Sequence, residues 1–133
     1  MSASPQAACQ TQTIPEPPTI LVVEDEVLIR LMIARHLRDR GFRVVEASHA
    51  GEALDALEAD ESIALLFTDV LMPGVMNGVM LARWVKQNRP DVSVLLTSAC
   101  SDFARDFPDE LLLAKPYAPE DVETHIRGLL GAH

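Results

Sequence analysis

Short apolar runs alternate with longer segments whose apolar residues recur at helical spacing, and this alternation constrains the fold more than any other feature. Five runs have strand length and consist mainly of Val, Ile, Leu and Phe, as expected of strands buried on both faces of a parallel sheet. They cover residues 19–23, 42–47, 63–68, 92–97 and 111–114. The pattern predicts one α/β domain, a doubly wound five-stranded parallel sheet with right-handed crossovers.

The segments between the runs predict the helices of this domain. Apolar residues at helical spacing indicate helices over 27–40, 77–88 and 119–130, a short helix over 101–107, and one that Ser48 caps and that runs to Leu57. Gly41 is expected in the left-handed conformation that ends the first helix. Pro119 suits the first turn of the last helix.

Composition limits the classes of protein to consider. Residues 1–18, rich in Ser, Ala, Gln, Thr and Pro, predict a disordered tail, and 19–133 a single domain that leaves no room for an output domain. The net charge of −9 argues against nucleic-acid binding, and no apolar run is long enough to span a membrane. Cys9 and Cys100 are too few for a disulfide framework, so we expect a cytoplasmic protein.

Polar residues follow four of the five predicted strands. Glu24 and Asp25 follow the first, Asp69 the third, Ser98 the fourth and Lys115 the fifth. Because the carboxyl ends of parallel strands share one edge of the sheet, these side chains are expected to converge there. Three carboxylates in one place repel each other, and a hard divalent cation with oxygen ligands, Mg²⁺, relieves that repulsion.

This set of groups suits phosphoryl transfer. A cation, the Lys115 ammonium and the Ser98 hydroxyl facing one carboxylate would position and neutralise a phosphoryl group, and Asp69 would be the nucleophile that forms an acyl phosphate. Taken singly, each residue is more simply a turn, cap or surface residue, as Asp25 could be for the first helix. Their joint placement at the strand ends favours the phosphoryl site.

Four segments resemble the receiver domain of two-component response regulators. They are Val22-Val23-Glu24-Asp25-Glu26, Thr68-Asp69-Val70-Leu71-Met72-Pro73, Leu96-Thr97-Ser98-Ala99 and Lys115-Pro116, within a match from about Ile20 to Leu130. The resemblance implies a flavodoxin-like sheet in strand order 2-1-3-4-5 flanked by five helices. It also implies phosphorylation by a sensor histidine kinase or a histidine phosphotransfer protein, with output through altered binding to a further protein.

The resemblance also implies a role for each matching residue. Asp69 would be the phosphoacceptor, Ser98 the switch hydroxyl and Lys115 the lysine that contacts the phosphoryl group, before a proline that is often cis. Asp25 and Asp69 would ligate Mg²⁺ directly and Glu24 through water. The backbone carbonyl of Leu71 would complete the ligand set. Such a chain catalyses its own phosphorylation and dephosphorylation rather than turning over a substrate.

The chain departs from the family pattern at several positions. Leu112 replaces the aromatic residue three before the lysine, so the usual coupling of hydroxyl and ring is not expected. The segment from Ser98 to Lys115 is short, and the loop from Pro73 to Gly78 is one residue longer than is common. Ala118 stands where a capping Asp is common, which predicts a weaker start to the last helix.

Two positions bear on the lifetime of the phosphoryl group. Leu71 lies two residues after Asp69 and Cys100 two after Ser98, and neither side chain can orient an attacking water. We therefore expect slow hydrolysis.

Other functions remain open at this point. The chain could be a phosphate shuttle or sink without its own output, or a degenerate receiver that only binds partners. A nucleotide or flavin binder would need a Gly/Ser/Thr-rich loop after the first strand, where this chain has Glu24-Asp25-Glu26. An aspartyl phosphohydrolase would carry a second acid two residues after its nucleophile, where Asp25 is followed by Val27.

Overall fold

A computed structural model describes residues 16–71, 76–98, 107–108 and 111–131. Its five strands form one parallel sheet in the order β2-β1-β3-β4-β5, which confirms the predicted topology. The strands are β1 (Thr19–Val23), β2 (Arg43–Ala47), β3 (Ile63–Asp69), β4 (Ser93–Ser98) and β5 (Leu112–Ala114). The helices among the described residues are α2 (Val27–Asp39), α3 (Ala50–Ala59), α4 (Gly78–Asn88) and α5 (Pro119–Leu130).

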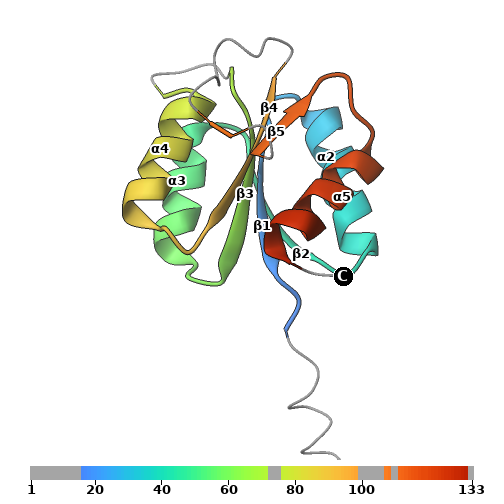
Figure 1. The fold of residues 1–133 in the computed structure, drawn as a ribbon, viewed down its shortest axis with the longest axis horizontal. Helices are drawn as coiled ribbons and strands as arrows, with labels where there is room; N and C mark the ends of the chain where they lie inside the picture. The colour runs from blue at the N-terminus through green and yellow to red at the C-terminus, as the bar shows by residue number, and fades with distance from the viewer. Residues whose placement is uncertain (1–15, 72–75, 99–106, 109–110, 132–133) are drawn as a thin grey trace, which may run out of the picture.

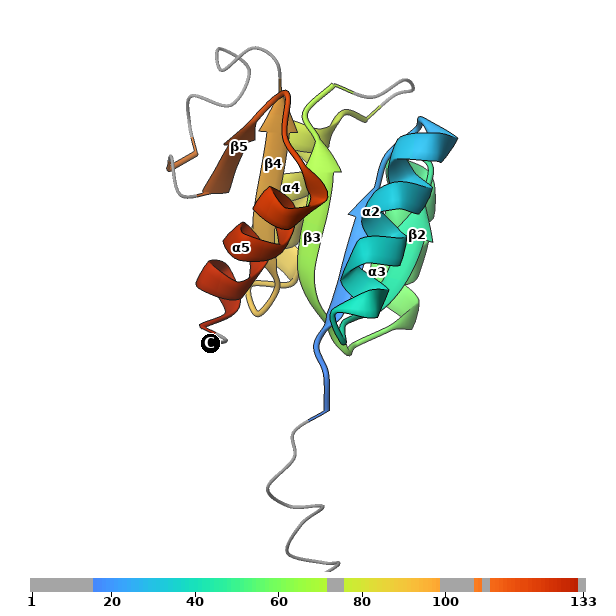
Figure 2. The ribbon, with the colours of Figure 1, turned by 90° about the vertical axis from the view of Figure 1, so that its right-hand side faces the viewer.

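The helices cover both faces of the sheet. Figure 1 shows α3 and α4 on one face and α2 and α5 on the other. Figure 2 shows α2 and α5 side by side over the sheet, seen from their own side. The short helix expected over 101–107 falls almost wholly outside the described residues.

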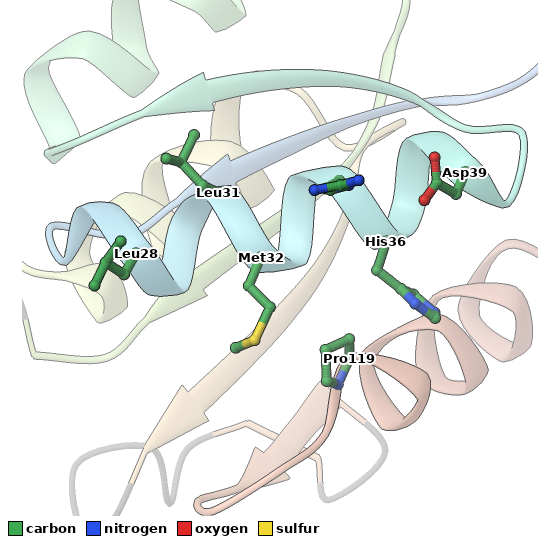
Figure 3. A pocket seen from close by; sticks show the side chains of 7 residues that line it. Leu28, Leu31, Met32, His36, Asp39 and Pro119 are labelled. Carbon is green, nitrogen blue, oxygen red and sulfur yellow. The ribbon is translucent and has the colours of Figure 1, made fainter.

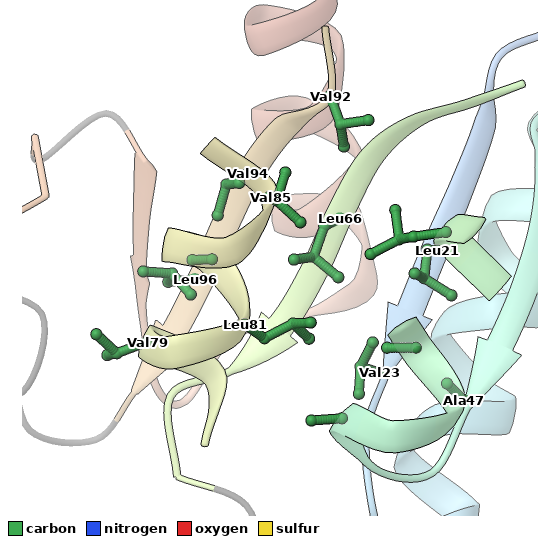
Figure 4. Close-up of a cluster of buried hydrophobic side chains, with 14 of the residues drawn as sticks. Leu21, Val23, Ala47, Leu66, Val79, Leu81, Val85, Val92, Val94 and Leu96 are labelled. Atoms are coloured by element: carbon green, nitrogen blue, oxygen red, sulfur yellow. The ribbon is translucent and has the colours of Figure 1, made fainter. Parts of the chain in front are cut away.

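Two apolar clusters form the core, one on each face of the sheet. Alternate residues of a strand point to opposite faces, so Leu21 and Leu66 face α3 and α4 whereas Ile20 and Leu65 face α2 and α5. Figure 4 shows the α3/α4 cluster, in which Leu81 and Val85 of α4 pack against the sheet. β1 and β3 are buried on both faces up to their carboxyl ends, Val23 and Asp69.

The observed structure corrects two details of the sequence prediction. Phe42 precedes β2 and belongs to the turn after α2, where it is buried and its N–H donates to the Leu37 carbonyl. His49, not Ser48, caps α3, because its ring accepts the N–H of Glu52. Ser48 donates its N–H and hydroxyl to the Glu52 carboxylate instead.

Other local predictions hold. Gly41 has φ 96° after α2, as its predicted left-handed conformation requires, and Pro119 begins α5. At Ala118 no side chain can cap α5, but the Asp121 carboxylate accepts the Ala118 N–H at 2.8 Å and supplies half of a capping box. No described helix is long and apolar enough to cross a membrane.

Candidate functional site

The carboxyl ends of β1, β3, β4 and β5 bring the predicted residues to one edge of the sheet. The strand register places Asp69 opposite Thr97, the residue before Ser98, and Ser98 opposite Ala114, the residue before Lys115. Convergence therefore follows directly from parallel pairing, as the sequence predicted.

Of the three acidic residues at the site Glu24 is the most buried, at 3% exposed, whereas Asp25 is exposed. Burial raises the pKa of the Glu24 carboxyl to about 7, and its hydrogen bond with Asp25 and the charge of Asp69 act in the same direction. The Glu26 N–H, which donates to Glu24 Oε2 at 3.1 Å, opposes the rise. Burial and the neighbouring acidic groups therefore favour a proton on Glu24 near neutral pH.

Asp69 ends β3 and is 8% exposed. Its Oδ1 accepts the N–H of Leu71 at 3.2 Å, and its Oδ2 lies 2.6 Å from the Lys115 Nζ. Burial alone lowers the pKa of the Lys115 ammonium, but the hydrogen bond and charge of Asp69, with the charges of Glu24 and Glu26, outweigh burial and raise it. Lys115 therefore stays charged at neutral pH beside the Asp69 carboxylate.

Ser98 and Leu112 lie on the adjacent strands. The Ser98 carbonyl accepts the Lys115 N–H at 3.2 Å, which ties the lysine backbone to the end of β4. The Lys115–Pro116 peptide is cis. Leu112, in place of an aromatic residue, packs half-buried against the α3/α4 cluster.

The start of α4 approaches the backbone of Asp69 very closely. Gly78 donates its N–H to the Val70 carbonyl at 2.9 Å. A Cβ on Gly78 would lie 2.8 Å from the Asp69 carbonyl carbon and closer still to its oxygen. Only a residue without a side chain fits there, so Gly78 sets the distance between α4 and the end of β3.

Tyr117 adds an aromatic ring on the other side of the site. Its ring meets Phe67 edge to face at a centroid distance of 6.0 Å. Burial, and then the charges of Glu24 and Asp69, raise the pKa of its hydroxyl. Tyr117, Lys115, Ile29 and Met32 line a groove of about 470 Å³ that opens beside the site.

Helix α2 carries a row of exposed apolar side chains that continues from this groove. Leu28 is 82% exposed and Met32 52%, and Val27 and Leu31 are also exposed. Figure 3 shows Leu28, Leu31 and Met32 along α2, with Pro119 of α5 across from Met32. These four residues line a shallow depression on the surface of α2. Met32 also lines the groove beside Lys115, so the apolar surface reaches the site. We call Val27, Leu28, Leu31 and Met32 the α2 apolar face.

The donor set fits a hard divalent cation. Glu24 and Asp69 lie at the carboxyl ends of the adjacent parallel strands β1 and β3, Asp25 is next along the chain, and oxygen ligands are those that Mg²⁺ prefers. In the described part of the chain no three His, Cys, Asp or Glu side chains are grouped so that they could hold a metal ion. The ligand set expected from the sequence needs no such group, because it takes only two carboxylates directly and completes the shell with a carbonyl and waters.

Sequence reasoning missed three residues that the structure places at the site. Arg30 donates to the Glu24 carbonyl at 2.8 Å, Gly78 meets Asp69, and Tyr117 borders Lys115. Only Gly78 carried a sequence signal, as the glycine that follows the helix-capping Asn77. Cys100 and residues 72–75 of the lengthened loop lie outside the described residues.

Comparison with known proteins gives one consistent result. Residues 20–127 match the family model described as the response regulator receiver domain. The chain is 33% identical over 120 residues to the two-component response regulator ORR3 of Oryza sativa subsp. indica, covering 84% of this chain and 91% of that protein. It is 32% identical over 118 residues to the sensor kinase CckA of Brucella abortus, covering 84% of this chain but only 12% of the kinase.

Solved structures have the same fold. A response regulator receiver protein from Sinorhizobium medicae superposes with a TM-score of 0.79 at 28% identity, over 88% of this chain and 97% of that one. The response regulator protein TrrA from Thermotoga maritima, solved in complex with Mg²⁺-BeF, gives a TM-score of 0.73 at 24% identity, over 84% of this chain and 98% of that one.

Proposed function

This chain belongs to the response regulator receiver domain family of two-component systems, and on that premise we propose that Asp69 accepts a phosphoryl group from a phosphohistidine. The observation that carries the proposal is the contact of 2.6 Å between Lys115 Nζ and Asp69 Oδ2. The nearly buried Asp69 carboxylate is paired with the Lys115 ammonium at the end of β3. A lysine in this position can move its contact from the carboxylate to an oxygen of an attached phosphoryl group.

The step exchanges one bond to phosphorus for another. An Asp69 carboxylate oxygen attacks the phosphorus, the P–N bond to the donor imidazole breaks as the new P–O bond forms, and the imidazole nitrogen takes up a proton. The Leu71 N–H on Oδ1 leaves Oδ2 as the oxygen that faces Lys115. Positioning and charge neutralisation supply most of the catalysis in such transfers.

Mg²⁺ is the cofactor that the site would hold. Asp25, Asp69 and the Leu71 carbonyl would bind it directly and Glu24 through water, and when bound it would neutralise charge on the phosphoryl oxygens. Support comes from the donor chemistry and from the TrrA structure, which contains Mg²⁺-BeF. The proton that Glu24 holds near neutral pH would leave when the cation binds.

The phosphodonor would be a histidine kinase or phosphotransfer protein that docks on the α2 apolar face. A donor must bring its imidazole to Asp69, and an exposed apolar surface next to the site suits a partner helix. The α2 apolar face continues into the groove beside Lys115. Phosphorylation would then shift a two-state surface near β4 and β5 that an output protein binds.

Intact mass spectrometry after incubation with acetyl phosphate and Mg²⁺ tests the proposal. The expected result is a gain of one phosphoryl group that depends on Mg²⁺ and is lost in Asp69→Asn. The absence of an adduct both with acetyl phosphate and with cognate histidine kinases would refute it.

A pair of variants tests the docking surface. Leu28→Glu on α2 should slow transfer from a phosphorylated kinase by about tenfold or more, because a buried apolar contact at an interface is worth about 2 kcal/mol. Its phosphorylation by acetyl phosphate should be unchanged. Met80→Glu is the matched control, since Met80 is 44% exposed on α4, on the opposite face of the sheet. Equal effects of both variants on kinase transfer would contradict the docking proposal.

A further inference from the structure

Within the loop that carries the acidic pair, the Glu24 carboxylate accepts the Glu26 N–H at 3.1 Å. Residues 24–26 join β1 to α2, and Glu26 caps the helix without a side-chain hydrogen bond. Asp25 is exposed, so the position of its carboxylate depends on the backbone on either side of it as well as on its contact with Glu24. Whatever fixes that backbone also fixes the carboxylate.

One side chain holds this backbone from outside the loop. The Glu24 N–H donates to the Ala47 carbonyl of β2 at 3.0 Å, which continues the sheet by one residue. On the other side of the residue, the Glu24 carbonyl accepts Arg30 Nη1 at 2.8 Å. The peptide between Glu24 and Asp25 therefore has its oxygen held by Arg30.

Arg30 is itself held in place. Its Nε lies 3.3 Å from Glu46 Oε1, and the two side chains are only 16% and 23% exposed. Glu46 sits on β2 and also binds Arg38 through Oε2 at 3.0 Å. An arginine fork can bond a carboxylate and a carbonyl at once, which a lysine cannot do as well. Arg38 shares the Glu46 anchor but bonds the Val44 carbonyl and not the loop.

We propose that Arg30, anchored by Glu46, is a positioning residue for the Mg²⁺ ligands Glu24 and Asp25. The inference rests on the proposed function, since it assumes that these acids bind the cation. Partners that orient metal ligands from outside are worth about 10- to 100-fold in metal affinity. Arg30 touches neither the reacting atoms nor the cation, and acts through the peptide that carries Asp25.

The direction in which Mg²⁺ affinity changes distinguishes a positioning role of Arg30 from a simple effect of its charge. Arg30 is a cation near an acidic site, so loss of its charge alone would strengthen Mg²⁺ binding. Loss of its hydrogen bond to the Glu24 carbonyl would weaken Mg²⁺ binding, because the loop must then be ordered when the cation binds. Arg38→Ala removes an equal charge from the same Glu46 anchor and leaves the loop contact intact, so it is the matched control.

Calorimetric titration with Mg²⁺ alone tests the inference without any phosphodonor. Arg30→Ala should weaken binding by about tenfold, and Arg38→Ala should leave it unchanged or slightly tighter. Glu46→Gln, which keeps Arg30 but loosens its anchor, should fall between wild type and Arg30→Ala. Arg30→Lys should recover part of the loss.

The dependence of acetyl phosphate labelling on Mg²⁺ gives a second readout. Arg30→Ala should raise the half-saturating Mg²⁺ concentration by the same factor, with the maximal rate within about twofold of wild type. Unchanged or tighter Mg²⁺ binding in Arg30→Ala, or equal loss in Arg38→Ala, would overturn the inference. If Arg30→Ala does not fold, Glu46→Gln and Arg30→Lys replace it, and unchanged or tighter Mg²⁺ binding in both would overturn the inference. Wild type that binds Mg²⁺ but takes no phosphoryl group would refute the proposed function and leave the titration result standing.

Discussion

Gly78→Ala is a small substitution with a large expected effect on the site. The added methyl group would lie 2.8 Å from the Asp69 carbonyl carbon and 3.0 Å from the Val70 Cα, where two carbon atoms normally stay about 3.5 Å or more apart. Its distance to the Asp69 oxygen would be shorter still. The contacted atoms are backbone, which cannot rotate away as a flexible side chain would, so α4 and the end of β3 must separate by about 1 Å.

Two measurable losses follow from that displacement. Overpacking of this kind costs about 3 kcal/mol, at the upper end of the usual range because backbone must move. For a domain of this size that lowers the melting temperature by about 12 °C. Displacing the Asp69 backbone by about 1 Å should slow phosphorylation by acetyl phosphate by about 100-fold, since the reacting oxygen leaves its position beside Lys115.

Thermal unfolding and the rate of acetyl phosphate labelling measure the two effects. Gly128→Ala is the control, because Gly128 lies inside α5 and its added Cβ would meet no atom within 4 Å apart from its chain neighbours and the backbone of its own helix. It should stabilise the protein by up to about 1 kcal/mol through helix propensity and leave labelling unchanged. Gly78→Ala with wild-type stability and labelling would refute the idea that Gly78 sets the position of Asp69.

Four further predictions concern the charges and solvent access at the site. The pKa of Glu24 is raised from 4.5 to about 7, so between these two pH values the folded chain holds a proton on Glu24 that the unfolded chain has lost. The contribution of Glu24 to the free energy of unfolding should therefore fall as pH rises from about 4.5 to about 7. Denaturation of wild type and Glu24→Gln over this pH range measures that contribution as the difference between the two proteins. Over the same window apparent Mg²⁺ affinity should rise with pH in wild type, and a flat calorimetric profile would contradict the assignment. Lys115→Met should slow labelling by about 100-fold while tightening Mg²⁺ binding, because one positive charge is lost from an acidic site; weaker Mg²⁺ binding would argue against this reasoning. Leu71→Asn, at a side chain 52% exposed beside Asp69, should speed loss of the phosphoryl group by about tenfold or more, and an unchanged decay followed by intact mass would show that Leu71 does not slow hydrolysis.

The sheet was predictable because its signal is strong and local. Runs such as Ile20–Val23 and Leu65–Phe67 are buried on both faces, so apolar continuity alone indicates parallel strands, and the parallel register then places Asp69 beside Ser98 and Lys115. Helix α5 was equally clear from Pro119 and its apolar spacing. For both the sheet and α5, the residues that determine the structure are close together in the sequence, so the pattern indicates the element directly.

The remaining features depend on choices between similar interactions or on distant contacts. Ser48 and His49 are both able to cap α3, and the Glu52 carboxylate binds Ser48 so that His49 takes the cap. Arg30 on α2 bonds both the Glu24 carbonyl and the Glu46 carboxylate on β2, and no spacing along the chain indicates those contacts. The role of Gly78 follows from how closely α4 approaches β3, a distance that only the packed structure fixes.

The central claim is that Asp69 is the residue that carries the phosphoryl group. Borohydride reduces an acyl phosphate to an alcohol, so peptide mapping after acetyl phosphate labelling and reduction locates the modified carboxylate by mass. The account predicts conversion at residue 69 alone, dependent on Mg²⁺, with the peptide that contains Glu24 and Asp25 unchanged. Conversion at Asp25 or at any other carboxylate in place of Asp69, or labelled protein with no reducible acyl phosphate, would contradict it.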